Sequence, residues 1–483
     1  MKVSMQRIKI IALFVFLSIV PRLCAQQSVE AIFASRVSQQ NLQRTVHDLV
    51  SFGNRLGGAA SGNKAAQYLY TRFENYGYSP ELCEDAEQLT YTNIHWKLQV
   101  DSPQTLQGLI QHEWLSGFSP SVPETVAPLR FVPTDKSNLD SLQGSVVLLD
   151  AQPTEKFYHK LVNAGAICII LFVRVNSPAY QHGAMIVQLP ASNRNPIPMF
   201  SISRTAGERL LRELNKGTSI TIRFSAETCI ANGKPKTVIA TLKGESEKYF
   251  IVCAHGDSDS GGPGADDNAS GVSGTLEIAR ILQSMVKRGS VSQPYYTIRF
   301  IIWGTEYASA THYVKMHEDD LENIAGVINI DEIGIGRPRQ CLYFEGNDVE
   351  HNKELLQVFQ SIGEEYAGKP GFWKEATTNP CQGGTDSYVF LPDYLRRLRV
   401  RREKIPSITV FTAAWNEPKQ LLQTPGWSSK AWKGNPDSVI IGYSPYYHSS
   451  LDIPALTTDK EPQKMIWGVK AVGMALLQIA WQN

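Results

Sequence analysis

The sequence has no excess of charge of either sign. It contains 47 Lys and Arg residues against 46 Asp and Glu residues, which gives a formal net charge of +1. A chain so balanced has no general attraction to nucleic acids or to anionic membranes, and we predict no nucleic-acid partner. Hydrophobic residues make up 42% and charged residues 19%, which excludes a disordered, collagen-like or coiled-coil chain. The 483 residues favour two or three domains.

Long apolar runs are missing beyond the N-terminus. Basic residues precede the apolar run Ile10–Val20, and a small residue, Ala25, closes the segment. This order is typical of a secretory signal, and the run is too short for a bilayer, which needs about 20 apolar residues. We predict a signal peptide over residues 1–25, export to the periplasm or the extracellular space, and no transmembrane segment in the mature chain. Cleavage lowers the formal net charge to −3 by removing Lys2, Arg7, Lys9 and Arg22.

Closely paired cysteines are also absent. No two cysteines have the CxxC spacing, which argues against a thiolate zinc site or a thioredoxin-type redox site. An exported chain permits disulfides. Cys168 and Cys253 lie in apolar runs, and we expect both to be buried thiols. The candidate bridges join Cys83 to Cys229 and Cys341 to Cys381.

The chain divides into parts with different patterns. Residues 26–87 have apolar residues at helical spacing, whereas residues 88–232 contain short β-like runs such as Ser145–Leu149. From residue 233 to residue 483 strands and helices alternate. Such alternation predicts an α/β fold with a mostly parallel central sheet flanked by helices. We predict that residues 88–232 form a β-rich domain inserted into it.

Three side chains that can bind metals or move protons stand near the ends of predicted strands. His255, Glu306 and Asp331 come shortly after the strands predicted at Tyr249–Ala254, Tyr296–Trp303 and Ile324–Ile330. In open α/β sheets, ligands bind beyond the carboxyl ends of the strands. A single Asp at such a place is usually a turn or capping residue. Three such residues at one edge predict a site.

The loop after the first of these strands gives the sharpest signal. His255 can offer a neutral imidazole nitrogen to zinc, and Asp257 can orient that ring. We expect Asp267 to start a helix, where its two carboxylate oxygens can bridge two cations. The alternative is a capped helix after a glycine-rich turn, with the acidic residues only solvated.

These motifs resemble those of the secreted zinc exopeptidases, the family of bacterial leucyl aminopeptidases, aminopeptidase Y and glutamate carboxypeptidase. The resemblance covers nearly all of the mature chain, and the 88–232 insert resembles a protease-associated (PA) domain. It implies the zinc exopeptidase fold for the rest, residues 26–87 included. The motifs that carry it are His255-Gly256-Asp257, Asp266-Asp267-Asn268-Ala269-Ser270-Gly271, Asn329-Ile330-Asp331 and Tyr447-His448-Ser449.

The resemblance also implies roles for these residues. His255 and Asp331 would bind one zinc ion, His448 would bind a second, and Asp267 would bridge the two. Glu306 would be the general base in the hydrolysis of a peptide substrate, most often at its N-terminal bond in this family. Three more residues would lie beside the metals or the substrate, namely Asp257, Asp386 and Tyr447.

One position departs from the family pattern. A Glu-Glu pair is expected after the second strand, of which the first is the base and the second a zinc ligand, but this chain has Glu306 followed by Tyr307. Glu332 could substitute, or Glu306 could itself be the ligand in a shifted register. One or two zinc ions are therefore expected. The rival hypotheses are a non-catalytic peptide-binding protein and a one-metal acyltransferase similar to glutaminyl cyclases, and the oligomeric state stays open.

Overall fold

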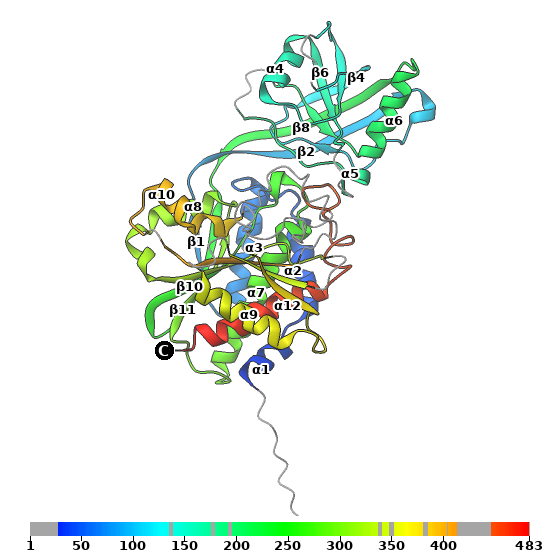
Figure 1. Cartoon of the computed structure of the whole chain (residues 1–483). Helices are drawn as coiled ribbons and strands as arrows, with labels where there is room; N and C mark the ends of the chain where they lie inside the picture. Colours follow the sequence, from blue (N-terminus) through cyan, green and yellow to red (C-terminus); the bar gives the residue numbers. More distant parts are fainter. Residues whose placement is uncertain are drawn as a thin grey trace, which may run out of the picture.

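Two β-sheets organise the molecule, which we describe from a computed structural model (Figure 1). The larger sheet, with its helices, forms the lower body in Figure 1, and the smaller body above it contains the second sheet. The predicted signal peptide and Cys381 lie outside the described residues. The structure describes residues 28–134, 139–174, 179–191, 196–336, 341–346, 352–379, 385–402, 404–412 and 446–482.

The central body takes its elements from both ends of the chain. Its helices are α1 (Val29–Ser35), α2 (Gln39–Ser51), α3 (Ala60–Tyr76), α7 (Gly271–Lys287), α8 (Ala308–Met316), α9 (Lys353–Tyr366), α10 (Pro392–Leu398) and α12 (Gln463–Ile479). Its strands are β1 (Glu81–Glu84), β9 (Lys236–Leu242), β10 (Ser246–His255), β11 (Tyr296–Trp303), β12 (Ile324–Ile330), β13 (Cys341–Glu345), β14 (Glu375–Asn379) and β15 (Ser407–Phe411).

The central sheet is mixed rather than mostly parallel. Its strand order is β1-β9-β11-β10-β12-β15-β13-β14, and the four strands from β11 to β15 in that order are parallel. β1 and β9 run antiparallel because they lead into and out of the second body without a crossover helix. β13 is antiparallel to β15. The prediction therefore holds for the middle of the sheet, which carries His255 and Asp331, and is wrong for its edges.

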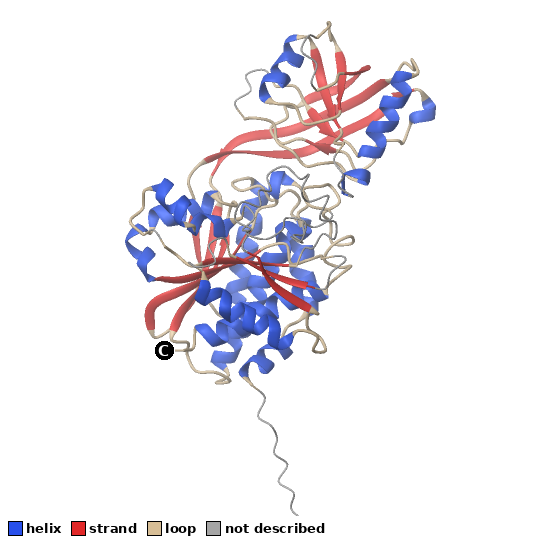
Figure 2. Ribbon diagram, viewed as in Figure 1, coloured by secondary structure: helices blue, strands red, loops and turns tan. Residues whose placement is uncertain are grey.

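Alternating side chains of β10 show how the sheet is covered on both faces. Phe250, Val252 and Ala254 pack into the large core with helices α1, α2, α3, α7, α9 and α12. The residues between them, Ile251 and Cys253 among others, face a second core with α8 and α10. A strand buried on both faces has a continuous apolar run, which is why its sequence predicted it. Helices thus lie on both sides of the sheet (Figure 2).

The second body has a mixed sheet of its own, with the order β2-β8-β4-β5-β6-β7-β3. One of its cores includes side chains of α6 and the other includes side chains of α4. In Figure 1 the long strands β2 and β8 run between the two bodies. The elements are β2 (Gln88–Ser102), β3 (Trp114–Leu115), β4 (Val122–Phe131), β5 (Ser145–Leu149), α4 (Glu155–Asn163), β6 (Ala166–Leu171), α5 (Ala179–His182), β7 (Met199–Ser201), α6 (Arg204–Asn215) and β8 (Thr221–Gly233).

The proposed bridge between Cys83 and Cys229 is wrong. Both residues are free thiols. Cys83 lies opposite Thr237 in the central sheet, whereas Cys229 lies opposite Thr92 in the other sheet. Because the two cysteines belong to different sheets, flanking the same segment in sequence does not bring them together. Cys168 and Cys253 are buried thiols as expected, and Cys341 is also buried.

In the described part of the chain, no helix combines the length and the apolarity that crossing a bilayer requires.

Candidate metal centre

Three buried side chains meet at the carboxyl edge of the central sheet. His255, Asp267 and Asp331 each offer a ligand atom, and these atoms all lie within 4.8 Å of one another. His255 Nε2 is 3.3 Å from Asp267 Oδ1 and 3.6 Å from Asp331 Oδ1. One imidazole and two carboxylates form a donor set that zinc accepts in catalytic sites.

The parallel strands β10 and β12 bring two of these residues together. His255 is the last residue of β10, and Asp331 directly follows β12. The two strands are paired neighbours, with Cys253 opposite Asn329, so their ends meet at one edge of the sheet. This is the placement that the strand ends predicted.

Asp267 does not start a regular helix, contrary to our prediction. It lies in a wide helical turn over Ala265–Ser270, with φ −105° and ψ 94°, and α7 begins only at Gly271. The carboxylate of Asp452 holds this turn by accepting hydrogen bonds from the backbone N–H groups of Asp266 (2.8 Å) and Asp267 (3.0 Å). This distant residue holds the turn, which is why local capping rules did not predict its shape.

Asp257 sets the orientation of the His255 ring, as the sequence suggested. Its Oδ1 lies 3.1 Å from His255 Nδ1, so the other ring nitrogen, Nε2, points to Asp267 and Asp331. Burial alone would lower the pKa of His255. Asp331 and the other two carboxylates outweigh burial and raise the pKa of His255 well above its usual range. The negative charge around this ring also favours a metal cation.

The two carboxylate oxygens of Asp331 differ: one accepts a hydrogen bond, and the other faces His255. The Thr385 hydroxyl donates to Asp331 Oδ2 (2.5 Å), and the amide of Asn329 donates to that hydroxyl (2.8 Å). Asp331 Oδ1 is buried and receives no hydrogen bond from the described residues. A buried carboxylate oxygen without a donor is costly, and a cation between Oδ1 and His255 would satisfy it. The residues present therefore fit a metal ion.

The predicted second metal position has fewer donors among the described residues. His448 Nε2 lies 3.2 Å from Asp267 Oδ2, so the two oxygens of Asp267 face two different histidines, as a bridging carboxylate would. The ring of Tyr447 stacks on the ring of His448 with centroids 3.5 Å apart. Glu332, the suggested substitute, is not part of the ligand cluster found among the described residues.

Glu306 and Tyr307 lie on the turn between β11 and α8. The backbone N–H of Glu306 donates to Asp257 Oδ1 (3.0 Å), and that of Tyr307 donates to Asp386 Oδ1 (3.0 Å). Burial raises the pKa of Glu306 well above its usual range, although His255 lowers it. Burial also raises the pKa of Asp386 to about 7. Raised carboxyl pKa values suit groups that exchange protons near neutral pH.

Comparison with known proteins identifies the domain that carries this centre. A model of peptidase family M28 matches residues 237–471, which include His255, Glu306 and His448. Just under half of the chain therefore matches peptidase family M28.

The curated relatives match only part of this chain. It is 29% identical to a probable lipoprotein aminopeptidase, LpqL, of Mycobacterium tuberculosis over 220 residues, which are 44% of this chain and 40% of that protein. The first curated relatives are matched over less than half of their own length.

Solved structures extend the likeness in fold to nearly the whole molecule. An M28 peptidase precursor of Shewanella amazonensis SB2B superimposes with a TM-score of 0.63 at 19% identity, covering 94% of this chain and 95% of that one. The zinc aminopeptidase BSAP of Bacillus subtilis superimposes with a TM-score of 0.57 at 18% identity, covering 92% and 95%. At these identities the likeness establishes the α/β fold.

Sequence reasoning missed Arg55 at the metal centre, as it missed Asp452. Arg55, between α2 and α3, is fully buried. Its guanidinium donates to the carbonyl oxygens of Gly256 (3.2 Å), Pro263 (2.9 Å) and Gly264 (2.9 Å), which belong to the loop between His255 and Asp267. A lone arginine in a loop carries no signal in the sequence, because an exposed arginine looks the same.

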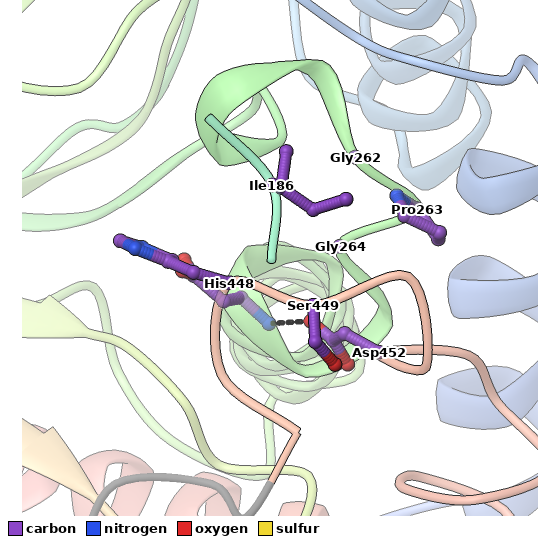
Figure 3. A pocket seen from close by; sticks show the side chains of 8 residues that line it. Ile186, Gly262, Pro263, Gly264, His448, Ser449 and Asp452 are labelled. Atoms are coloured by element: carbon purple, nitrogen blue, oxygen red, sulfur yellow. Dashed lines mark hydrogen bonds and ion pairs between the residues drawn. The ribbon is translucent and has the colours of Figure 1, made fainter. Parts of the chain in front are cut away.

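A small open pocket adjoins the predicted second metal position (Figure 3). Its empty volume of about 190 Å³ includes open solvent, and His448, Asp267, Ser449 and Asp452 supply its polar side chains. Ile186, from the second body, also lines it.

Proposed function

We propose that this protein is an exported zinc-dependent exopeptidase that removes N-terminal residues from peptides. The observation that carries the proposal is the meeting of His255, Asp267 and Asp331 with Glu306 at one edge of an M28 domain. Zinc is supported by the imidazole and carboxylate donors and by the similarity in fold to BSAP of Bacillus subtilis, a zinc aminopeptidase. Aminopeptidase action is supported by the names of the relatives.

Each residue has a role in this proposal. When bound, zinc would polarise the scissile carbonyl and make water a stronger acid. His255 and Asp331 would hold one ion, His448 the other, and Asp267 both. Glu306 would take a proton from the attacking water and pass it to the leaving amine. Asp386 accepts a hydrogen bond from the backbone N–H of Tyr307, the residue after Glu306, and would thereby hold the turn that presents the base.

The second body and the N-terminus belong to the same proposal. We infer that residues 88–232 form a PA-like domain inserted into a peptidase domain of residues 26–87 and 233–483, because two independent cores surround the second sheet. A signal peptide over residues 1–25 fits an exported enzyme, and one relative is named a lipoprotein.

Two substitutions test the function. Glu306→Gln removes a proton carrier and keeps the size of the side chain. We expect it to lower kcat on aminoacyl substrates by 10²-fold or more, on the order of what general base catalysis contributes, while zinc content stays unchanged. His255→Ala is expected to lose most bound zinc in elemental analysis. Full hydrolysis by the Glu306→Gln variant would rule out this mechanism.

Tyr307 favours a second candidate function. A neutral phenol is a poor zinc ligand, and burial raises the pKa of Tyr307 further above its usual range. The centre would then hold one zinc ion through His255, Asp267 and Asp331, as in a one-metal acyltransferase or a peptide-binding relative. Product analysis separates these cases, since a cyclase-like enzyme releases ammonia or water from an N-terminal residue and leaves every peptide bond intact.

A further inference from the structure

A short stretch of the second body pairs with the chain that carries His448. Met185 forms an antiparallel bridge with Ser449. The N–H of Ile186 donates to the carbonyl of His448 (2.8 Å), and the N–H of Ser450 donates to the carbonyl of Ala184 (2.9 Å). The two segments thus form a two-stranded contact between parts of the chain that are more than 250 residues apart.

Side chains reinforce this backbone contact. The hydroxyl of Ser450 accepts a hydrogen bond from the N–H of Ala184 (2.9 Å) and donates one to the carbonyl of His112 (2.8 Å). The hydroxyl of Tyr180 donates to the carbonyl of Tyr447 (3.4 Å). The groups that form these hydrogen bonds with residues 447–450 all belong to the second body. Several hydrogen bonds therefore hold this segment to that body.

His448 needs such support because its backbone is held in an unfavourable conformation. Its φ is +50°, in the left-handed region that residues other than glycine rarely occupy. Residues in this region keep their conformation only where the surroundings impose it. Ile186 binds the carbonyl of His448 itself, and Asp452 anchors the other end of the segment to the turn of Asp267.

The same stretch also reaches the pocket. In Figure 3 the side chain of Ile186 lies on the pocket that His448 and Asp452 line. The side chain of Ile186 lies against Gly262, where an added Cβ would come within 3.1 Å of Ile186 Cγ1. Ile186 therefore contributes its N–H to the placement of His448 and its side chain to the wall of the pocket.

We propose that the second body is part of the metal centre, because Ala184–Ile186 fixes the backbone of His448 and thereby positions this ligand opposite Asp267. Ile186 is a positioning residue through its N–H group. The inference rests on the proposed function in treating His448 as a metal ligand. It predicts that the second metal position forms only while this stretch is docked.

Hydrogen–deuterium exchange of the full chain tests the proposal at residue 186. Ile186→Pro removes the N–H donor, whereas Ile186→Ala keeps the donor and shortens the side chain. In zinc-free protein, we expect Ile186→Pro to speed exchange of the peptide over residues 446–452 about 10-fold or more, and Ile186→Ala to leave it near the rate of the unaltered chain. Peptides from β5 and β6 serve as the check that the second body stays folded. Equal exchange in the two variants would overturn the proposal.

If the Ile186→Pro variant fails to fold, a second variant and a second measurement test the same proposal. Ser450→Ala removes two hydrogen bonds to the second body, and Thr228→Val, which removes a hydroxyl bonded to Ser119 within that body, is its matched control. Added zinc should slow exchange over residues 446–452 in the unaltered chain and in Thr228→Val, and clearly less in Ser450→Ala and Ile186→Pro. Equal slowing in all four proteins overturns the proposal, as does its absence from the unaltered chain. Exchange is read without turnover, so loss of the proposed peptidase activity alone would leave the result standing.

Discussion

At the scale of single residues, the charge of Arg55 balances the acidic groups of the metal loop. Burial lowers the pKa of Arg55 to about 10, while the carboxylates of Asp257, Asp452 and Asp267 raise it. The guanidinium therefore stays charged at neutral pH. It binds three carbonyl oxygens of one loop, a task for which a planar fork of donors is suited and a lysine ammonium is not.

Replacing this arginine should cost stability and metal affinity together. Arg55→Met leaves three buried carbonyls and a group of carboxylates without their cation, and removing one partner of a buried charge pair costs about 3–5 kcal/mol. We expect a loss in the free energy of unfolding of that order in urea titrations, together with weaker zinc binding in a chelator competition. Arg44→Met, at an exposed position of α2, is the matched control and should change stability by less than about 0.5 kcal/mol.

Position 307 decides how many metal ions the centre can hold. Tyr307→Glu places a carboxylate where the family has its second Glu, and a carboxylate is ionised at neutral pH and binds zinc. We expect zinc per chain to rise toward two by elemental analysis. Tyr307→Phe keeps the ring, removes the hydroxyl and should keep the stoichiometry of the unaltered protein. A Glu variant with unchanged zinc content would mean that this turn does not reach the second position.

At the scale of elements, helix α12 buries a charged residue against the loop that follows Asp331. Lys464 is 1% exposed, donates to the carbonyl of Gly336 (3.2 Å), and lies 5.1 Å from the centroid of the Trp467 ring. Burial lowers the pKa of Lys464 from 10.5 to about 8, although Glu461 raises it. A lysine that loses its proton so early couples the stability of the helix to pH.

The lowered pKa of Lys464 predicts that the free energy of unfolding rises at alkaline pH. Between pH 8 and 10.5 the unfolded chain keeps the proton of Lys464 and the folded chain has released it, so raising the pH through this window favours folding. The full effect is about 3 kcal/mol at 1.36 kcal/mol per pKa unit. Lys464→Met should abolish it, which urea unfolding at pH 7 and pH 10 would measure as a difference from the unaltered protein. The expectation would be contradicted if the free energy of unfolding changed equally with pH in Lys464→Met and in the unaltered chain. Lys248→Met, at an exposed lysine, is the control.

Elements with strong local signals were predictable, whereas those fixed by distant contacts were not. β11 and β12 begin and end at the predicted residues, and β5 matches the β-like run Ser145–Leu149. The second half of β8 is mostly exposed and lacks an apolar run, so the sequence gives little sign that this strand continues to Gly233. Two of the candidate ligands, His255 and Asp331, were visible as strand ends, but Arg55 and Asp452 act through backbone groups far away in sequence. Such contacts leave no periodic pattern in the sequence.

At the scale of the whole molecule, the two bodies have separate hydrophobic cores. The cores of the second body include Cys168 and those of the central body include Cys253, and both thiols are fully buried. Burial raises the pKa of each thiol well above its usual range, so neither reacts while its core is folded. The two cysteines are thus natural reporters of the two cores.

Thiol labelling along a urea gradient should therefore resolve two steps. A smaller core buries less apolar surface and unfolds more easily, so we expect Cys168 to be labelled at lower urea than Cys253 when peptides are mapped by mass spectrometry. Cys229 is exposed and free and should react without urea. Simultaneous labelling of Cys168 and Cys253 would show that the bodies unfold as one unit.

The arrangement of β1 and β9 has a consequence for the order of folding. Glu81 pairs with Ile239, so these strands can meet only after a loop of about 150 residues has closed, and long loops slow the formation of such contacts. Within that loop, β2 and β8 pair from Ser102 with Thr221 down to Gln88 with Gly233. Once the second body has folded, its two ends are neighbours. They are then as close to each other as the two ends of a hairpin turn, although about 150 residues lie between them. During synthesis the second body would then fold first. Its paired strands β2 and β8 would bring β1 and β9 together in the register in which they pair.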